Sequence, residues 1–257
     1  MAKEASLLAI SQYAKTSDRL SARLSIHSWS TGASWFPWVA ARVPVSGEVL
    51  EVGAGTGELW RHVSAGADLR LTLSDFSASM CSDLERVTVS GAAAVSVVQA
   101  DATALPFGAG SFDGLVANQM LYHVDDPDAA LAEFSRVLRP GGALRVALNG
   151  MTHLDALLAV GEAVGRPSMM RHHAKISADN AAAILGRHFA DVRSERCPGN
   201  FEVTDVEPVV RYLHSVGAED LAPDQAQRAR DLVDAKIREE GAFRVTKNMV
   251  LFSARKP

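Results

Sequence analysis

Short apolar runs alternate with amphipathic segments between Glu48 and Asn149. The runs read VLEVGAG at 49–55, LRLTLSDF at 69–76, AVSVVQAD at 94–101, FDGLVANQ at 112–119 and GALRVALNG at 142–150. Helix-length stretches separate them, among them residues 58–66 and 77–87. Strands that alternate with helices predict βαβ units, a mostly parallel sheet and right-handed crossovers. The pattern therefore predicts a doubly wound α/β fold.

The helix expected after residue 119 has the clearest boundaries. Asp126 is a good N-cap residue, and Pro127 suits the first helical position. The apolar positions of this segment are Leu131, Phe134, Val137 and Leu138. They are spaced as one face of a helix, and residues 139–142 (RPGG) should end it.

The flanking regions suggest one domain with three parts. Residues 1–44 should form an N-terminal helical cover, and residues 45–150 the sheet core. Residues 151–257 should hold an insertion after the fifth strand, near residues 151–176, and the last strands, with 243–255 as one strand. Two caps are expected there: Ser177 before one helix, and a capping box from Thr204 to Glu207 before another.

The amino-acid composition and net charge of the chain argue against some classes of function. The chain has 257 residues, of which 47% are hydrophobic and 22% charged, as in an ordinary globular protein. The net charge of -4 gives no reason to expect a nucleic-acid partner. We see neither a signal peptide nor an apolar run of the roughly 18–20 residues that a membrane helix needs. A cytoplasmic protein without membrane contact is the expectation.

No metal is expected. Cys81 and Cys197 lack the spacing of metal ligands. Asp125, Asp126 and Asp128 are explained by the positive N-terminal end of the helix that follows them.

The turn after the first strand carries glycines at positions 53, 55 and 57. A dinucleotide fingerprint needs its third glycine where Glu58 stands, and no Gly-Lys-Ser/Thr follows for a P-loop. Glu58 would add bulk and negative charge beside a bound diphosphate. The turn therefore suits a ligand other than a diphosphate.

Acidic residues lie near the ends of the first three strands. They are Glu51, Asp75 and Asp101. The carboxyl ends of parallel strands line the crevice of an open α/β sheet. A carboxylate after the second strand can accept hydrogen bonds from both hydroxyls of a ribose. An acidic rim also suits a ligand that carries a sulfonium and an ammonium.

Taken together, the motifs resemble a known family. VLEVGAGTG, LSDFSASM, QADATALPF, FDGLVANQMLYHV and FSRVLRPGGALRVA are similar, in order and spacing, to the class I S-adenosylmethionine-dependent methyltransferases. The resemblance is closest to the ubiquinone-biosynthesis-like (type 11) group that acts on small molecules. It implies a Rossmann-like, seven-stranded sheet, S-adenosyl-L-methionine as the cofactor and S-adenosyl-L-homocysteine as the product.

The resemblance also implies which residues bind this cofactor. Gly53, Ala54 and Gly55, with Glu51 nearby, would meet its amino-acid part, and Asp75 its ribose. Phe76 and Met80 would flank the adenine or the ribose, and Asp101 and the amide of Ala102 would bind the adenine. Asn118 would offer its backbone carbonyl to the ammonium, with Gln119 beside it and Tyr13 closing the pocket. For Gly57 and Met80 simple packing is the alternative, and for Glu51 contact with water.

The acceptor side is less defined. Methyl transfer is an in-line displacement, so the protein mainly positions the acceptor and excludes water. His123 is a candidate base with packing as the even alternative, and His27 is a second candidate. Arg171, His173, Lys175, Arg211 and Tyr212 form two partly basic segments that suit an anionic acceptor, unless they are simply a solvated surface.

The sequence thus predicts methyl transfer to a small molecule. Two alternatives stay open. One keeps the scaffold and its bound cofactor for a non-methyl rearrangement or cyclisation. The other is a non-catalytic protein that binds the cofactor or a partner.

Overall fold

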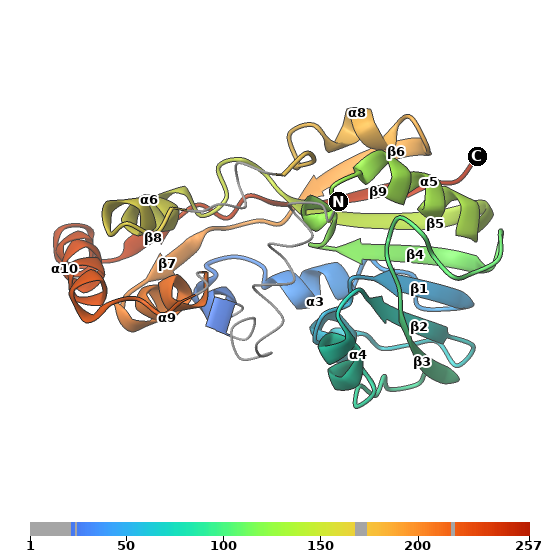
Figure 1. Ribbon diagram of the computed structural model, residues 1–257, viewed down its shortest axis with the longest axis horizontal. Coiled ribbons are helices and arrows are strands. Elements are labelled where there is room, and N and C mark those ends of the chain that lie inside the picture. The colour runs from blue at the N-terminus through green and yellow to red at the C-terminus, as the bar shows by residue number, and fades with distance from the viewer. Residues whose placement is uncertain (1–21, 24, 168–173, 217–218) are drawn as a thin grey trace.

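A seven-stranded sheet forms the core of the computed structural model, which describes residues 22–23, 25–167, 174–216 and 219–257 (Figure 1). Its strands are β1 (Glu48–Val52), β2 (Arg70–Asp75), β3 (Ala94–Gln99), β4 (Phe112–Asn118), β5 (Leu138–Asn149), β6 (Ala190–Arg196) and β9 (Met249–Arg255). Their order is β3-β2-β1-β4-β5-β9-β6. Strands β1 to β5 are parallel, and β9 runs antiparallel to β5 and β6. The expected Rossmann-like, mostly parallel fold is confirmed.

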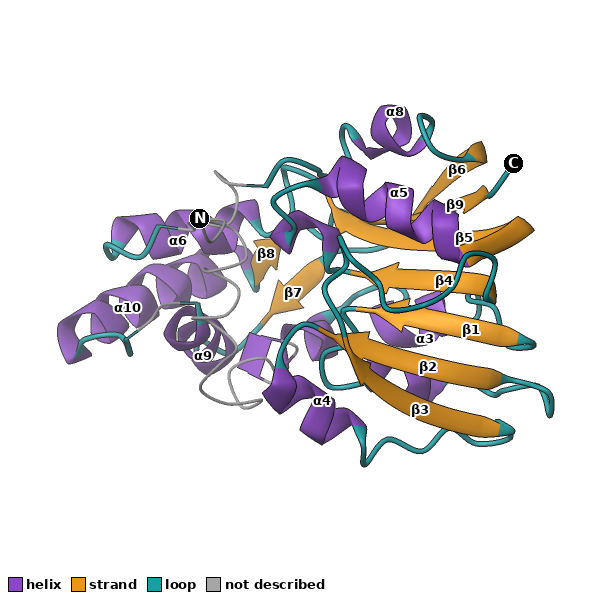
Figure 2. Ribbon diagram, turned by 45° about the vertical axis from the view of Figure 1, so that its right-hand side comes forward, coloured by secondary structure: helices purple, strands orange, loops and turns teal. Residues whose placement is uncertain are grey.

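Helices cover both faces of this sheet (Figure 2). Leu50 and Val52 belong to the hydrophobic cluster of α5 (Pro127–Val137) and α8 (Ala181–Leu185). Val49 belongs to the cluster that includes Trp35 and Trp38 of α3 (Trp35–Ala40). Alternate residues of β1 are therefore buried against different helices, which explains why its apolar run is nearly continuous.

Helix α5 begins and ends close to where the sequence predicts. The Asp126 carboxylate accepts a hydrogen bond of 3.0 Å from the amide of Ala129, and Pro127 occupies the first turn. Leu131, Phe134 and Val137 are fully buried on one side of the helix. The other two expected caps are absent: α8 has Asn180 at its N-cap, and α9 (Glu207–Ser215) has Val206 without a side-chain cap.

A smaller lobe lies beside the carboxyl ends of the parallel strands (Figure 1). This small lobe contains α6 (Asp155–Ala163), β7 (Phe201–Val203), α9, α10 (Pro223–Glu240) and β8 (Phe243–Val245). Strands β7 and β8 pair antiparallel, with Phe201 opposite Val245. Most of the lobe therefore comes from the chain between β6 and β9, and only α6 comes from the expected insertion.

Two further expectations differ from the structure. The strand expected over 243–255 is two strands in different sheets, because β8 belongs to the small lobe and β9 to the core. The helix expected over 58–66 is only a short 3-10 turn, η2 (Glu58–His62), since Val63 returns to an extended conformation. Similar turns form η1 (Ser25–Trp29) and η3 (Leu121–His123), and α4 (Ala78–Leu84) follows β2.

Lys247 and Asn248, between β8 and β9, join the lobe to the core. Both are buried, with exposed fractions of 2% and 5%. The Lys247 ammonium donates to Ser30 Oγ at 2.7 Å and to the carbonyl of Ala33 at 2.8 Å. The side-chain nitrogen of Asn248 donates to Oγ1 of Thr152, which follows β5, at 2.9 Å. Its side-chain oxygen accepts from Arg196 of β6 at 3.1 Å.

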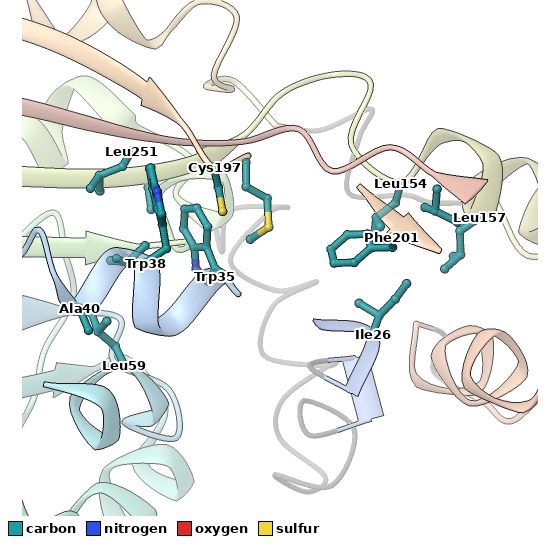
Figure 3. Packing of buried hydrophobic residues seen from close by; sticks show 14 of the residues in the cluster. Ile26, Trp35, Trp38, Ala40, Leu59, Leu154, Leu157, Cys197, Phe201 and Leu251 are labelled. Atoms are coloured by element: carbon teal, nitrogen blue, oxygen red, sulfur yellow. The ribbon is translucent and has the colours of Figure 1, made fainter. Parts of the chain in front are cut away.

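Apolar packing crosses the same junction. Figure 3 shows Trp35 and Trp38 of α3 near Cys197 and Leu251, while Ile26, Leu154 and Phe201 gather on the side of the small lobe. All of these residues belong to one buried hydrophobic cluster. Residues 26–38, the core and the lobe therefore contribute to one continuous hydrophobic cluster.

Candidate functional site

A cavity of about 440 Å³ opens at the carboxyl ends of β1 and β4, where the order of the strands reverses. Open α/β sheets bind ligands at this point of the fold. The size falls within the range of small-molecule sites, about 300–1,000 Å³. The wall includes Gly53, Asp75 and Asn118 from the core, Ile26 and Phe36 from the N-terminal segment, and Leu158, Tyr212 and Val216 from the small lobe and its edge.

The glycine turn needs glycine for two different reasons. Gly53, Gly55 and Gly57 all have left-handed backbones, with φ of 70°, 59° and 70°. A Cβ on Gly53 would lie 2.6 Å from Cβ of Met120, which also lines the cavity. A Cβ on Gly57 would lie 2.7 Å from Cγ2 of Val87, after α4. Gly53, Ala54 and Gly55 line the cavity, whereas Gly57 packs against the layer behind it.

Asp75 connects the turn to the end of β2. One carboxylate oxygen accepts from the amide of Gly55 and the other from the amide of Ser77, both at 2.9 Å. Burial raises the pKa of this carboxyl, and the backbone donors oppose that effect. Each oxygen keeps a second lone pair, so the group can still accept hydrogen bonds from a ligand.

Glu51 lies on the floor of the cavity. Its side chain is buried, and one oxygen accepts a hydrogen bond of 2.5 Å from the indole nitrogen of Trp60. Burial raises the pKa of Glu51 to about 8, although the Trp60 hydrogen bond lowers it. The carboxyl is therefore largely protonated at neutral pH.

The far end of the cavity combines a flat apolar ring with backbone and carboxyl groups. Phe76 is 49% exposed there, whereas Met80 and Ala102 are buried in the wall. Asp101 accepts hydrogen bonds of 2.8 Å from the amide and hydroxyl of Thr103. These four residues thus lie together, at the place where the resemblance puts an adenine.

The opposite end is lined by the polar residues that follow β4. Asn118 accepts a hydrogen bond of 3.3 Å from the indole of Trp35. Gln119 has a left-handed backbone with φ of 58°, which is rare for a residue with a side chain. Its side-chain amide is buried in the cavity wall and has no hydrogen-bond partner among the described residues.

Two neutral histidines complete this end. Burial, with a further contribution from the charge of Arg23, lowers the pKa of His123 to about 3. Burial and the charge of Lys247 lower the pKa of His27 to about 4. The His27 ring packs edge-on against Phe36 and Phe201, at 5.7 Å from each. Both imidazoles are therefore uncharged at neutral pH, and as bases they are weak.

The residues expected to hold an acceptor are only partly brought together. Tyr13, Arg171 and His173 lie outside the described residues. Lys175 is exposed and donates to the backbone carbonyl of Asp125 at 2.6 Å, and Arg211 is exposed on α9. Neither of these two lines the cavity, but Tyr212 does.

Sequence reasoning missed several residues of the wall. Asn149 ends β5, and His153, Leu154 and Leu158 belong to the segment that follows it. The carboxyl end of β5 was a usable signal for Asn149, since neighbouring parallel strands end at the same edge. The other three depend on the position of the small lobe, which no local pattern indicates.

Two kinds of feature are missing from the described part of the chain. Within it, no three His, Cys, Asp or Glu side chains are grouped so that they could hold a metal ion. None of the helices in the same ranges has the length and apolar character needed to cross a membrane.

Comparison with known proteins agrees with this geometry. Residues 50–146 match the family model described as a methyltransferase domain (Methyltransf_11). The O-methyltransferase rstn1 of Aspergillus nomiae is 37% identical over 103 residues, which cover 38% of this chain and 45% of that protein. The ubiquinone/menaquinone biosynthesis C-methyltransferase UbiE of Hahella chejuensis is 38% identical over 108 residues, covering 40% and 43%.

The match is thus to the core alone, and the chain spans less than half the length of these curated relatives. A solved structure of phosphoethanolamine N-methyltransferase 2 from Haemonchus contortus has a TM-score of 0.59 at 17% identity. The match covers 96% of this chain and 59% of the Haemonchus contortus chain. At this identity the likeness shows a shared fold only. The sequence motifs, the fold and the matched domain place residues 50–146 among the class I S-adenosylmethionine-dependent methyltransferases, in the ubiquinone-biosynthesis-like group.

Proposed function

We propose that this chain transfers a methyl group from S-adenosylmethionine to a small-molecule acceptor by in-line displacement. The observation that carries the proposal is the continuity of the cavity. One space runs from Asp75 and Phe76 of the core to Leu158 and Tyr212 of the small lobe. A methyl donor and an acceptor can therefore meet inside it. The net charge of -4 supports a small molecule over a nucleic acid.

The residues around the glycine turn fit the donor. Bound S-adenosylmethionine supplies an electrophilic methyl group on a sulfonium. Asp75 has free lone pairs for ribose hydroxyls, and the turn at Gly53 and Gly55 allows a ligand to approach the backbone closely. Phe76 exposes a flat apolar face to the cavity, which supports packing against a purine. Asn118 is assigned to the ammonium through its backbone carbonyl.

The protein then contributes by alignment and by exclusion of water. Holding the reacting atoms in line is a large part of catalysis when the cofactor carries the reactive carbon. Ile26, Phe36 and Leu158 close the acceptor end with apolar surface. His123 and His27, being neutral, can orient an acceptor by hydrogen bonds. With a pKa of about 3, His123 would be an inefficient general base near pH 7.

Two titrations test the proposal. Calorimetry should show S-adenosylmethionine and S-adenosylhomocysteine binding to the wild type. Asp75→Asn should weaken both by about tenfold or more, since one charge-assisted hydrogen-bonding group is lost. Asp83→Asn is the matched control, because Asp83 pairs with Arg86 on the surface.

The same preparations are then screened with candidate acceptors for release of S-adenosylhomocysteine. Loss of affinity in Asp75→Asn alone, with product formed by the wild type, supports the proposal. A folded wild type that binds neither molecule contradicts it, and so does equal weakening in the two variants.

A further inference from the structure

Two carboxamide side chains lie at the ends of neighbouring strands in the cavity wall. Gln119 follows β4 and Asn149 is the last residue of β5. The amide of Gln119 donates to the carbonyl of Ala147 at 3.0 Å, two residues before Asn149. Both residues therefore lie at the same edge of the sheet, on the side of the small lobe.

Their hydrogen-bonding capacity is not used by the part of the chain that the structure describes. Nε2 and Oε1 of Gln119 and Oδ1 of Asn149 are all buried without a hydrogen-bond partner there. Leaving a buried polar atom unmet destabilises the folded protein, so most such atoms are satisfied by protein, water or ligand. The left-handed backbone of Gln119 adds a strain that is typical of functional sites.

The charged residues of the same wall are in a different situation. Arg23 and Asp125 line the cavity, and each already interacts with other residues of the chain. The side chains of Lys175 and Arg211 are exposed and do not line the cavity. The unmet atoms of Gln119 and Asn149, and Nδ1 of His27, all belong to groups that carry no charge at neutral pH.

Much of the remaining surface is apolar. The acceptor end is lined by Ile26, Trp35, Phe36, Leu154, Leu158, Ile176, Val216 and Met249. A ligand that fits here presents mostly hydrocarbon, with a polar group directed at the two carboxamides.

Building on the proposed methyl transfer, we propose that Gln119 and Asn149 bind a neutral hydroxyl group of the acceptor and so select uncharged, largely apolar molecules. A hydroxyl both donates and accepts, which matches one free amide nitrogen and two free amide oxygens. A carboxylate can only accept, and it would face those oxygens. An ammonium can only donate, so it would face the amide nitrogen of Gln119, and burying its charge costs more than burying a hydroxyl.

The family resemblance places Gln119 beside the cofactor without specifying an atom, and this assignment leaves its backbone available for that contact. The side chain and the main chain of one residue then serve different ligands. Gln119→Met and Asn149→Leu remove the carboxamides while keeping a similar volume, so they separate recognition from packing.

The experiment compares three probes that differ only in their polar group: naphthol, naphthoate and naphthylmethylamine. Each is titrated by calorimetry into the protein saturated with S-adenosylhomocysteine. Naphthol should bind about tenfold more tightly than the charged probes, and each variant should lose about tenfold in naphthol affinity. Gln227→Met, an exposed change on α10, is the matched control and should behave as the wild type.

Several results would overturn the inference. They are tighter binding of either charged probe, no binding of naphthol, or a preference that survives both substitutions. The S-adenosylhomocysteine titration that precedes each measurement separates the two proposals. Product binding without a preference for naphthol removes only this inference, whereas absent product binding removes the proposed function and this inference with it.

Discussion

At the scale of single residues, the protonation state of Glu51 should depend on whether a charged ligand occupies the cavity. The carboxyl is buried between the indole of Trp60 and the negative charge of Asp75, and its pKa is raised to about 8. A cationic ligand beside it would favour the ionised form. Cofactor binding near neutral pH should therefore drive a proton off this group.

We expect S-adenosylmethionine affinity to rise as the pH increases from 6 to about 8 and then to level off. Binding at pH 7 should release up to about one proton, and Glu51→Gln should abolish this release. The measurement is the binding enthalpy in buffers of different ionisation enthalpy. Equal proton release by the wild type and the variant would show that another group titrates.

The same shift has a consequence for folding. Because the pKa in the folded protein lies above the usual value of 4.5, the folded state holds the proton more tightly than the unfolded state. The free energy of unfolding should then fall as the pH rises from about 4.5 to 8. Glu51→Gln should flatten this part of the stability profile measured with urea.

At the scale of elements, the contact between the glycine turn and α4 holds the cavity floor against the layer behind it. Gly57 provides the close approach, since any Cβ there would collide with Val87 and press on Leu84. Gly110 has a similar left-handed φ of 64°, but a Cβ added to it would have no atom within 4 Å. An alanine at position 110 would therefore meet backbone strain alone, whereas an alanine at position 57 would meet the same strain and a steric clash.

Gly110→Ala should lower the free energy of unfolding by about 1 kcal/mol, which is the cost of a left-handed backbone. Gly57→Ala should lower it by about 2–3 kcal/mol, because a steric clash adds to the same strain. Chemical denaturation measures both values. Equal losses would mean that the turn and α4 do not pack as closely as the structure shows.

Local signals account for the elements that the sequence predicts well. The caps and stripe of α5 are carried by Asp126, Pro127 and Phe134, whose effects act within one or two turns of the helix. The cofactor-side residues follow from the strand ends in the same way, because the carboxyl ends of parallel strands share one edge. Their role as ligands of this chain stays a prediction.

The small lobe could not be predicted, because it depends on contacts between distant residues. Its strands β7 and β8 are three residues each and pair across about forty positions of sequence. Such short strands carry too little alternation to be recognised. The residues between β8 and β9 read as one strand because Thr246, Lys247 and Asn248 contain no turn signal of glycine or proline.

At the scale of the whole molecule, Asn248 links several segments at the junction of the core and the small lobe. Its side-chain carboxamide hydrogen-bonds to Thr152 and Arg196. Its backbone N–H donates to Nδ1 of His153 at 3.2 Å. It therefore connects the segments after β5, β6 and β8 with buried hydrogen bonds.

Asn248→Ala should lower the free energy of unfolding by about 2–3 kcal/mol, since buried partners lose their hydrogen bonds. Amide exchange in β7, β8 and α9 should accelerate more than in β1 and β4. Asn180→Ala, an exposed change that also removes a carboxamide, is the control and should cost less. Uniform acceleration over the whole chain would contradict a junction between two parts.

The pairing of β7 with β8 also affects how the ligand specificity of the cavity can change between related proteins. Phe201 and Val245 stand opposite each other, so the segment between them leaves and re-enters the molecule at nearly one point. An insert with adjacent ends is exchangeable without stretching its host. Residues 201–245 form such a cassette: evolution or an engineer can replace it to reshape the part of the cavity lined by Tyr212 and Val216, while the glycine turn and Asp75 in the core stay as they are.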